Sequence, residues 1–81
     1  MSDVEERVKK IIAEQFGVDP RELRDDMTFA EDLMAESIDI VELIAALEEE
    51  FGVEIPEEEA QKNKTIGEAI EYMKKKKLGV G

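Results

Sequence analysis

The sequence predicts a small all-α protein: a four-helix bundle of three main helices plus one short helix, with a long ordered first loop. Three observations predict this class. Apolar residues recur at helical spacing in three separate segments, and capping or stop signals bound those segments. The β-prone run 53–55 has no clear partner run with which to pair.

The first helix is expected to end at Gly17, since a glycine at that position terminates a helical pattern. Ser2 and Glu5 fit a capping box at its start. Its apolar residues have helical spacing: Val4, Val8, Ile11, Ile12 and Phe16. The stretch from Gly17 to Glu36 is too long for an ordinary structureless connection, so we expect an ordered loop.

Local signals divide this loop. Asp19 and Pro20 suit the start of one short helical turn, and Thr28 with Glu31 is a second capping-box candidate. Five apolar residues are expected to fix the loop to the core: Val18, Leu23, Met27, Phe29 and Leu33.

The second helix is predicted over Ser37–Phe51, a run without Gly or Pro that Gly52 closes. At about 100° per residue, one face is apolar and should meet the core: Ile40, Leu43, Ile44, Leu47 and Phe51. The opposite face carries a stripe of apolar and acidic residues: Ile38, Val41, Ala45, Glu42, Glu48 and Glu49. This docking stripe fits a partner with an apolar centre and a basic rim, or it is an ordinary exposed face.

The last two helices have clear start signals. Pro56 and the acids that follow it suit the start of a short third helix. Thr65 and Glu68 form a capping box that opens the last helix, and the lysine run 74–77 complements the dipole at its end. We therefore expect a helical bundle over residues 1–75 and a flexible basic tail over 76–81.

Composition narrows the function. The 81 residues include no Cys and no His, so disulfides, thiolate ligands and the usual general base are missing and no enzyme activity is predicted. No segment approaches the ~20 apolar residues of a membrane span, and no signal pattern precedes the first charges. These observations predict a soluble cytoplasmic protein that does not insert into membranes.

The charge is unevenly distributed. The net charge is −11, and residues 25–61 hold 14 acids and no Lys or Arg. Such a segment repels nucleic acid and attracts basic protein surfaces or divalent cations. A calcium-binding helix–loop–helix pattern fails, because Asp25, Met27 and Phe29 stand where liganding oxygens are needed, so we predict no metal site.

Ser37 lies at the start of the second helix and has two interpretations. The commonest role of such a serine is to cap the helix through its hydroxyl. The alternative is a phosphoester on that hydroxyl, placed where helix amides favour negative charge. The neighbours Glu36 and Asp39 are acidic and no His is present, so Ser37 is a poor nucleophile and a suitable substrate for modification.

Segment 31–43, which reads EDLMAESIDIVEL, closely resembles the attachment region of acyl carrier proteins, whose pattern runs Asp-Leu-Gly-Ala-Asp-Ser-Leu-Asp. Collinear segments elsewhere also look like bacterial fatty-acid carriers: 5–12, 46–51, 54–56 and 57–60. The resemblance therefore covers nearly the whole chain.

The resemblance implies that Ser37, flanked by Glu36 and Asp39, receives 4′-phosphopantetheine from coenzyme A through a separate phosphopantetheinyl transferase. The thiol of that arm then carries acyl groups as thioesters in fatty-acid biosynthesis. It also implies that the docking stripe of a monomeric carrier meets basic patches on the transferase, synthases and acyltransferases. An acyl chain can be sheltered by inward residues whose other interpretation is ordinary core: Leu47, Phe51, Ile55, Ile66 and Ile70.

Three positions depart from the family pattern: Glu36 replaces Asp, Ile38 replaces Leu, and Met34 replaces Gly. They motivate a second hypothesis, a specialised carrier for a polyketide or other dedicated pathway. A third hypothesis is an unmodified structural subunit that docks through its acidic stripe.

Overall fold

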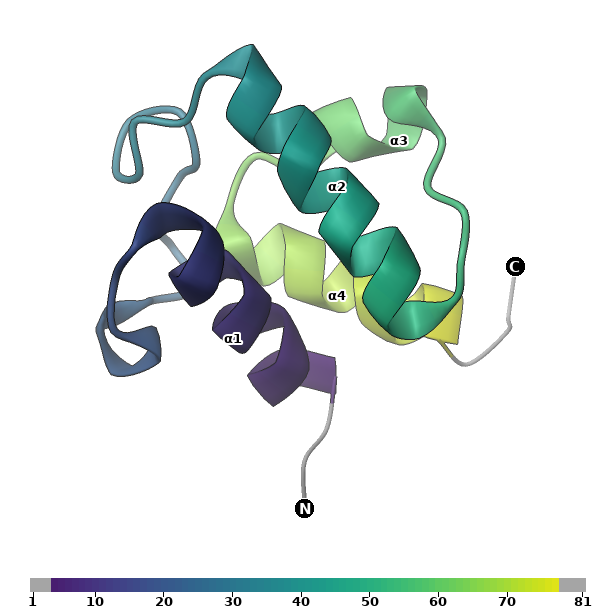
Figure 1. The fold of residues 1–81 in the computed structure, drawn as a ribbon, viewed down its shortest axis with the longest axis horizontal. Helices are drawn as coiled ribbons and strands as arrows, with labels where there is room; N and C mark the ends of the chain where they lie inside the picture. Colours follow the sequence, from purple (N-terminus) through teal and green to yellow (C-terminus); the bar gives the residue numbers. More distant parts are fainter. Residues whose placement is uncertain (1–3, 78–81) are drawn as a thin grey trace.

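A computed structural model describes residues 4–77, which form four α-helices and one short 3₁₀ helix (Figure 1). The elements are α1 (Val4–Phe16), η1 (Pro20–Glu22), α2 (Ser37–Phe51), α3 (Glu57–Lys62) and α4 (Ile66–Lys77). Within this range there is no strand, only an isolated bridge between Thr28 and Thr65. The predicted all-α fold is confirmed, including the short helical turn after Asp19.

The core lies where α1 packs against both α2 and α4. Val8 and Ile12 of α1 and Ile66 of α4 are fully buried. Arg7 clamps α1 to the end of α2: its Nε donates to Glu50 at 3.0 Å, and its guanidinium lies 4.4 Å from the centroid of the Phe51 ring. In the part of the chain that the structure describes, no helix is long and apolar enough to cross a membrane.

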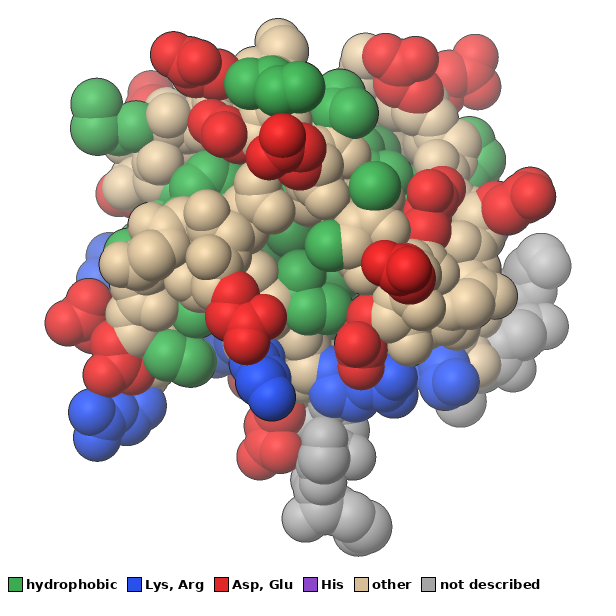
Figure 2. All heavy atoms as spheres, viewed as in Figure 1, with side chains coloured by type: hydrophobic (Ala, Val, Ile, Leu, Met, Phe, Trp, Pro, Cys, Tyr) green, Lys and Arg blue, Asp and Glu red, His purple; other side chains and the backbone are tan. Residues whose placement is uncertain are grey.

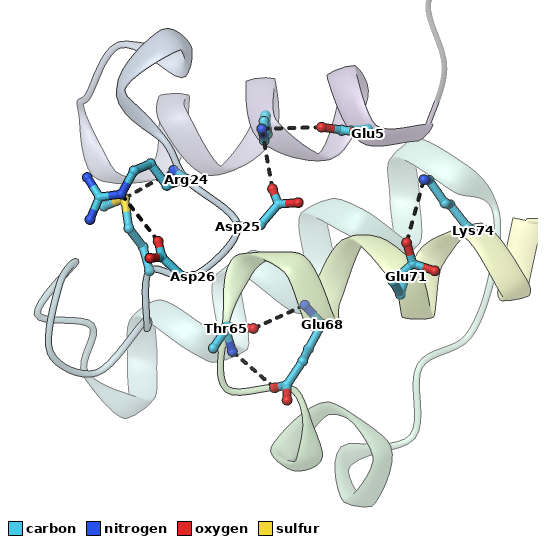
Figure 3. Close-up of polar contacts among 10 residues, drawn as sticks. Glu5, Arg24, Asp25, Asp26, Thr65, Glu68, Glu71 and Lys74 are labelled. Carbon is cyan, nitrogen blue, oxygen red and sulfur yellow. Dashed lines mark hydrogen bonds and ion pairs between the residues drawn. The ribbon is translucent and has the colours of Figure 1, made fainter.

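The helix ends follow the predicted signals where the structure describes them. The amide of Glu68 donates to Thr65 Oγ1 at 3.1 Å, and the Thr65 amide donates to Glu68 Oε1 at 3.2 Å, which confirms the capping box (Figure 3). Gly52 ends α2 in the left-handed conformation, with φ of 65°. The capping box predicted at Ser2 lies outside the described residues.

The loop between α1 and α2 is ordered, and its buried Leu23 and Phe29 join the core. Its backbone pairs with the segment that enters α4, since the Ile66 amide donates to the carbonyl of Met27 at 2.9 Å. Lys9 of α1 reaches Asp25 of the loop at 3.5 Å (Figure 3). The loop therefore holds α2 in place relative to α1 and α4.

The second capping-box candidate was only half right. The Glu31 amide donates to Thr28 Oγ1, but the carboxylate that accepts from the Thr28 amide is that of Asp32, at 2.8 Å, and no helix follows. The reason is a tight turn: the amides of Asp32 and Leu33 both donate to the Thr28 carbonyl, which places Asp32 back over Thr28.

At the other end of the chain, α4 continues to Lys77, two residues into the range that the sequence predicted as a tail. The rest of that range, 78–81, lies outside the described residues.

Candidate functional site

Ser37 is the first helical residue of α2, and Glu36 before it is the N-cap. The capping role considered for Ser37 is therefore wrong. The physical reason is Asp39: its Oδ2 accepts from the Glu36 amide at 2.9 Å, while the Glu36 carbonyl accepts from the Ile40 amide at 3.1 Å. The N-cap is therefore Glu36, one residue before Ser37.

The Ser37 hydroxyl is left without a structural task. Ser37 is exposed, and its hydroxyl makes no hydrogen bond to any other residue between 4 and 77. It lies in the first turn of a helix of 15 residues, where backbone amides lack intrahelical partners and the dipole favours an anion. A phosphoester oxygen suits this position. The chain has no His, and the two carboxylates beside Ser37 are only weak bases, of which Asp39 accepts from the Glu36 amide.

Ser37 also lines an open groove of about 590 Å³ between α2 and α3, which we call the α2–α3 groove. Its apolar wall comes from α2, with Ile40, Val41 and Ile44. Its other wall comes from Ala60 of α3, Asn63 just after α3 and Ala35 of the loop. A smaller cavity of about 40 Å³ lies deeper, and it shares Ile40, Ile44, Ala60 and Asn63 with the groove. The groove therefore adjoins the cavity, which reaches Leu47 and Met73 of the core.

The sequence-based pocket is only partly the same. All five of its residues are buried, as expected for core. Leu47 and Ile55 line the small cavity, whereas Phe51, Ile66 and Ile70 line neither the cavity nor the groove. Sequence reasoning missed Ile44, Ala60 and Asn63 as groove residues. Ala60 of α3 and Asn63 just after it could not be found from the apolar pattern of the sequence, because α3 has no fully buried residue that would mark an inward face.

The docking stripe is exposed as predicted, with one exception. Ile38 and Val41 are 56% and 59% exposed, and Ala45 and Glu49 are exposed too. The exception is Glu48, which is half-buried and accepts from the Ile55 amide at 2.8 Å, so it also fixes the turn after α2.

Figure 2 shows this face of the molecule in space. Acidic and hydrophobic side chains alternate over α2, while Lys and Arg gather along the lower edge. Glu42, on the same helix, accepts from Gln15 Nε2 at 3.1 Å, which ties the stripe to α1. The face therefore presents apolar groups among carboxylates.

An exposed, unbonded serine at the start of an acidic helix, beside an apolar groove, is accessible to another enzyme. Residues 6–73 match the family model described as the phosphopantetheine attachment site. The fold is similar to that of the acyl carrier protein from Enterococcus faecalis, with a TM-score of 0.74 and 38% identity over 86% of this chain and 89% of that one. The chain belongs to the acyl carrier protein family, and phosphopantetheine is its cofactor.

Proposed function

We propose that Ser37 is the residue that carries the phosphopantetheine arm, and that the loaded protein carries acyl intermediates of fatty-acid biosynthesis. The observation that carries the proposal is the Ser37 hydroxyl, exposed and without a hydrogen bond in the first turn of α2. Ser37 also lies inside the matched range 6–73. The only other serine of the chain, Ser2, lies outside that range.

The chemistry requires a second enzyme and coenzyme A. Ser37 Oγ bonds to the phosphorus that bears the pantetheine, the pyrophosphate bond breaks, and adenosine 3′,5′-bisphosphate leaves. We assign the base that takes the hydroxyl proton to the transferase, since the chain has no His and the carboxylates beside Ser37 are weak bases. Once attached, the arm supplies a thiol that holds acyl groups as thioesters, which a chain without cysteine cannot do itself.

The α2–α3 groove is the proposed shelter for an acyl chain. The cavity behind it, of about 40 Å³, has room for only a few water molecules, since each needs roughly 10–15 Å³ of such space. An acyl chain that is too long for this small cavity can therefore be buried only if α3 moves away from α2. This helix suits such a movement because it has only six residues and buries none of them fully.

The docking stripe is the proposed contact with partner enzymes. Its carboxylates fit basic patches on the transferase, synthases and acyltransferases, and Ile38 and Val41 supply an apolar centre. Contacts of this kind associate quickly and weaken with salt, which suits a carrier that must leave each enzyme. We also propose that the protein is a monomer and that it acts in the cytoplasm.

The attachment residue is tested by intact mass. Incubation with coenzyme A and a broad-specificity phosphopantetheinyl transferase should add the mass of one arm to the wild-type protein and none to Ser37→Ala. The matched control is Ser2→Ala, which should gain the arm as the wild type does. A mass gain in Ser37→Ala would contradict the assignment.

The pathway is tested on protein isolated from its native host. Fatty acyl thioesters of several lengths would support fatty-acid biosynthesis. A single polyketide or other unusual acyl group would support the specialised carrier instead, which the exposed Met34 beside the site favours. Native protein that never carries the arm would support a structural subunit.

A further inference from the structure

Three large hydrophobic side chains are exposed among residues 4–77, and all of them lie around Ser37. Ile38 and Val41 follow it on α2, and Met34 precedes it in the loop. Met34 is the most exposed of the three, at 79%. A single exposed apolar side chain is ordinary, but three that gather around one residue form a patch of the kind found at contact sites.

The backbone of Met34 makes the position more unusual. Its φ is 53°, the only positive φ of a non-glycine residue in the part of the chain that the structure describes. This left-handed region favours glycine, because a Cβ crowds the following carbonyl. Met34 therefore combines an unfavourable backbone with a side chain that the fold does not use, and such combinations cluster at functional sites.

The loop holds Met34 outward. On one side of it, the Leu33 amide donates to the Thr28 carbonyl at 3.2 Å; on the other, the Ala35 amide donates to the Phe29 carbonyl at 2.8 Å. Leu33 and Ala35 both pack against the core. Met34 cannot turn inward unless these contacts break, so its side chain is presented to a partner in advance of binding.

Distance along the chain decides which partner must meet it. Met34 lies three positions before Ser37, so their Cα atoms are at most about 11 Å apart. An enzyme that reaches Ser37 Oγ therefore covers Met34. The surrounding surface is acidic, because Glu31, Asp32 and Glu36 are exposed.

We propose that Met34 is an apolar anchor for the transferase that loads Ser37, and that it enters an apolar hollow bordered by Lys or Arg. The proposal rests on the proposed function, since it assumes that Ser37 is the loaded residue. We infer the basic border from charge complementarity with the acidic surface around Met34, and the apolar hollow from the outward side chain of Met34.

The test is the steady-state loading of Met34 variants, with coenzyme A, by the phosphopantetheinyl transferase of the native host, because a broad-specificity enzyme also loads carriers that have the family's Gly at this position. Met34→Gly and Met34→Gln should raise the KM for the carrier about tenfold with kcat nearly unchanged, a loss of about 1.4 kcal/mol in binding. Met34→Leu, which keeps an apolar side chain, should load like the wild type. Met34→Gly should also melt no lower than the wild type, because glycine accepts this φ.

Glu31→Gln is the matched control from the same loop. Its effect on KM should vanish at about 0.5 M salt, where charges are screened, while the effect of Met34→Gly should persist. An unchanged KM in Met34→Gly, or an equal loss in Met34→Leu and Met34→Gln, would overturn the anchor while the arm still attaches at Ser37. A wild-type protein that gains no arm at Ser37 would instead overturn the proposed function.

Discussion

Gly67 is one of the residues at which the loop touches α4. Its amide donates to the Asp25 carbonyl at 2.9 Å. A Cβ built on Gly67 would lie 3.0 Å from the Asp25 Cβ and 3.1 Å from the Asp25 carbonyl oxygen. The backbone of Asp25 would have to move to make room, and that backbone positions the loop that leads to Ser37.

Gly67→Ala should therefore destabilise the protein by about 1–3 kcal/mol, the usual cost of forcing an extra group into a packed site. Helix propensity alone predicts the opposite sign, since alanine within α4 would stabilise it by about 0.5–1 kcal/mol. Urea unfolding followed by circular dichroism gives the sign directly from the midpoint. A midpoint above that of the wild type would mean that the contact with Asp25 adapts freely.

Single residues also mark what the sequence could predict. The Thr65 capping box was predicted correctly, because both partners lie within one turn and nothing competes for the Thr65 amide. The hydroxyl of Ser37 was open to two interpretations, and only the structure showed that Asp39 does the capping. The left-handed φ of Met34 agrees with the Gly that the family pattern has at this position, and hydrogen bonds on both sides of the residue hold it.

At the scale of elements, α3 depends on polar contacts with α4, since none of its residues is fully buried. The Tyr72 hydroxyl donates to Glu59, and Lys76 approaches the same carboxylate at 4.0 Å. Burial first, and then the hydrogen bond and the charge of Glu59, raise the pKa of Tyr72 from 10.0 to about 12. Tyr72 also lines the small cavity behind the α2–α3 groove.

Tyr72 is the only tyrosine of the chain and there is no tryptophan, so tyrosinate absorbance reports on Tyr72 of α4 and on its contact with Glu59 of α3. The midpoint should lie near pH 12 in the folded protein and near 10.0 in urea. Because the unfolded chain ionises first, the stability due to this pKa shift is complete below pH 10.0 and is lost as the pH rises to about 12. The variant Tyr72→Phe should not show this part of the loss of stability at high pH.

Glu59→Gln separates the causes. It removes the charge, so the pKa of Tyr72 should fall, yet burial should keep it above 10.0. If the tyrosinate absorbance of the wild-type protein had the same midpoint pH in the folded and unfolded states, that result would contradict the contact between α3 and α4.

The elements themselves were predictable because their signals are local. The run Ser37–Phe51 and its closing Gly52 gave α2 with both bounds. The path of the loop was not predictable, because it depends on pairing of Phe29 with Lys64 and of Met27 with Ile66, residues far apart in sequence. The α2–α3 groove was missed for the same reason, since its walls come from segments that only the fold brings together.

At the scale of the whole molecule, the acidic segment remains largely unneutralised after folding. Of its 14 acids, Asp25, Asp26, Glu50 and Glu59 have a Lys or Arg within 4.0 Å, and the other ten have none among residues 4–77. These four contacts all come from cations outside the segment. Folding therefore brings like charges together around α2 and α3, which opposes the compact state.

Added salt should therefore stabilise the fold. If screening removes about 1 kcal/mol of repulsion between 10 and 500 mM NaCl, the Tm of a domain this small should rise by roughly 4–8 °C. Scanning calorimetry at constant pH measures the shift, and MgCl₂ at equal ionic strength is the control. Equal shifts indicate screening, whereas a larger shift with Mg²⁺ indicates direct binding to the carboxylates. A Tm that stays the same when either salt is added would contradict a repulsive charge cluster in the folded protein.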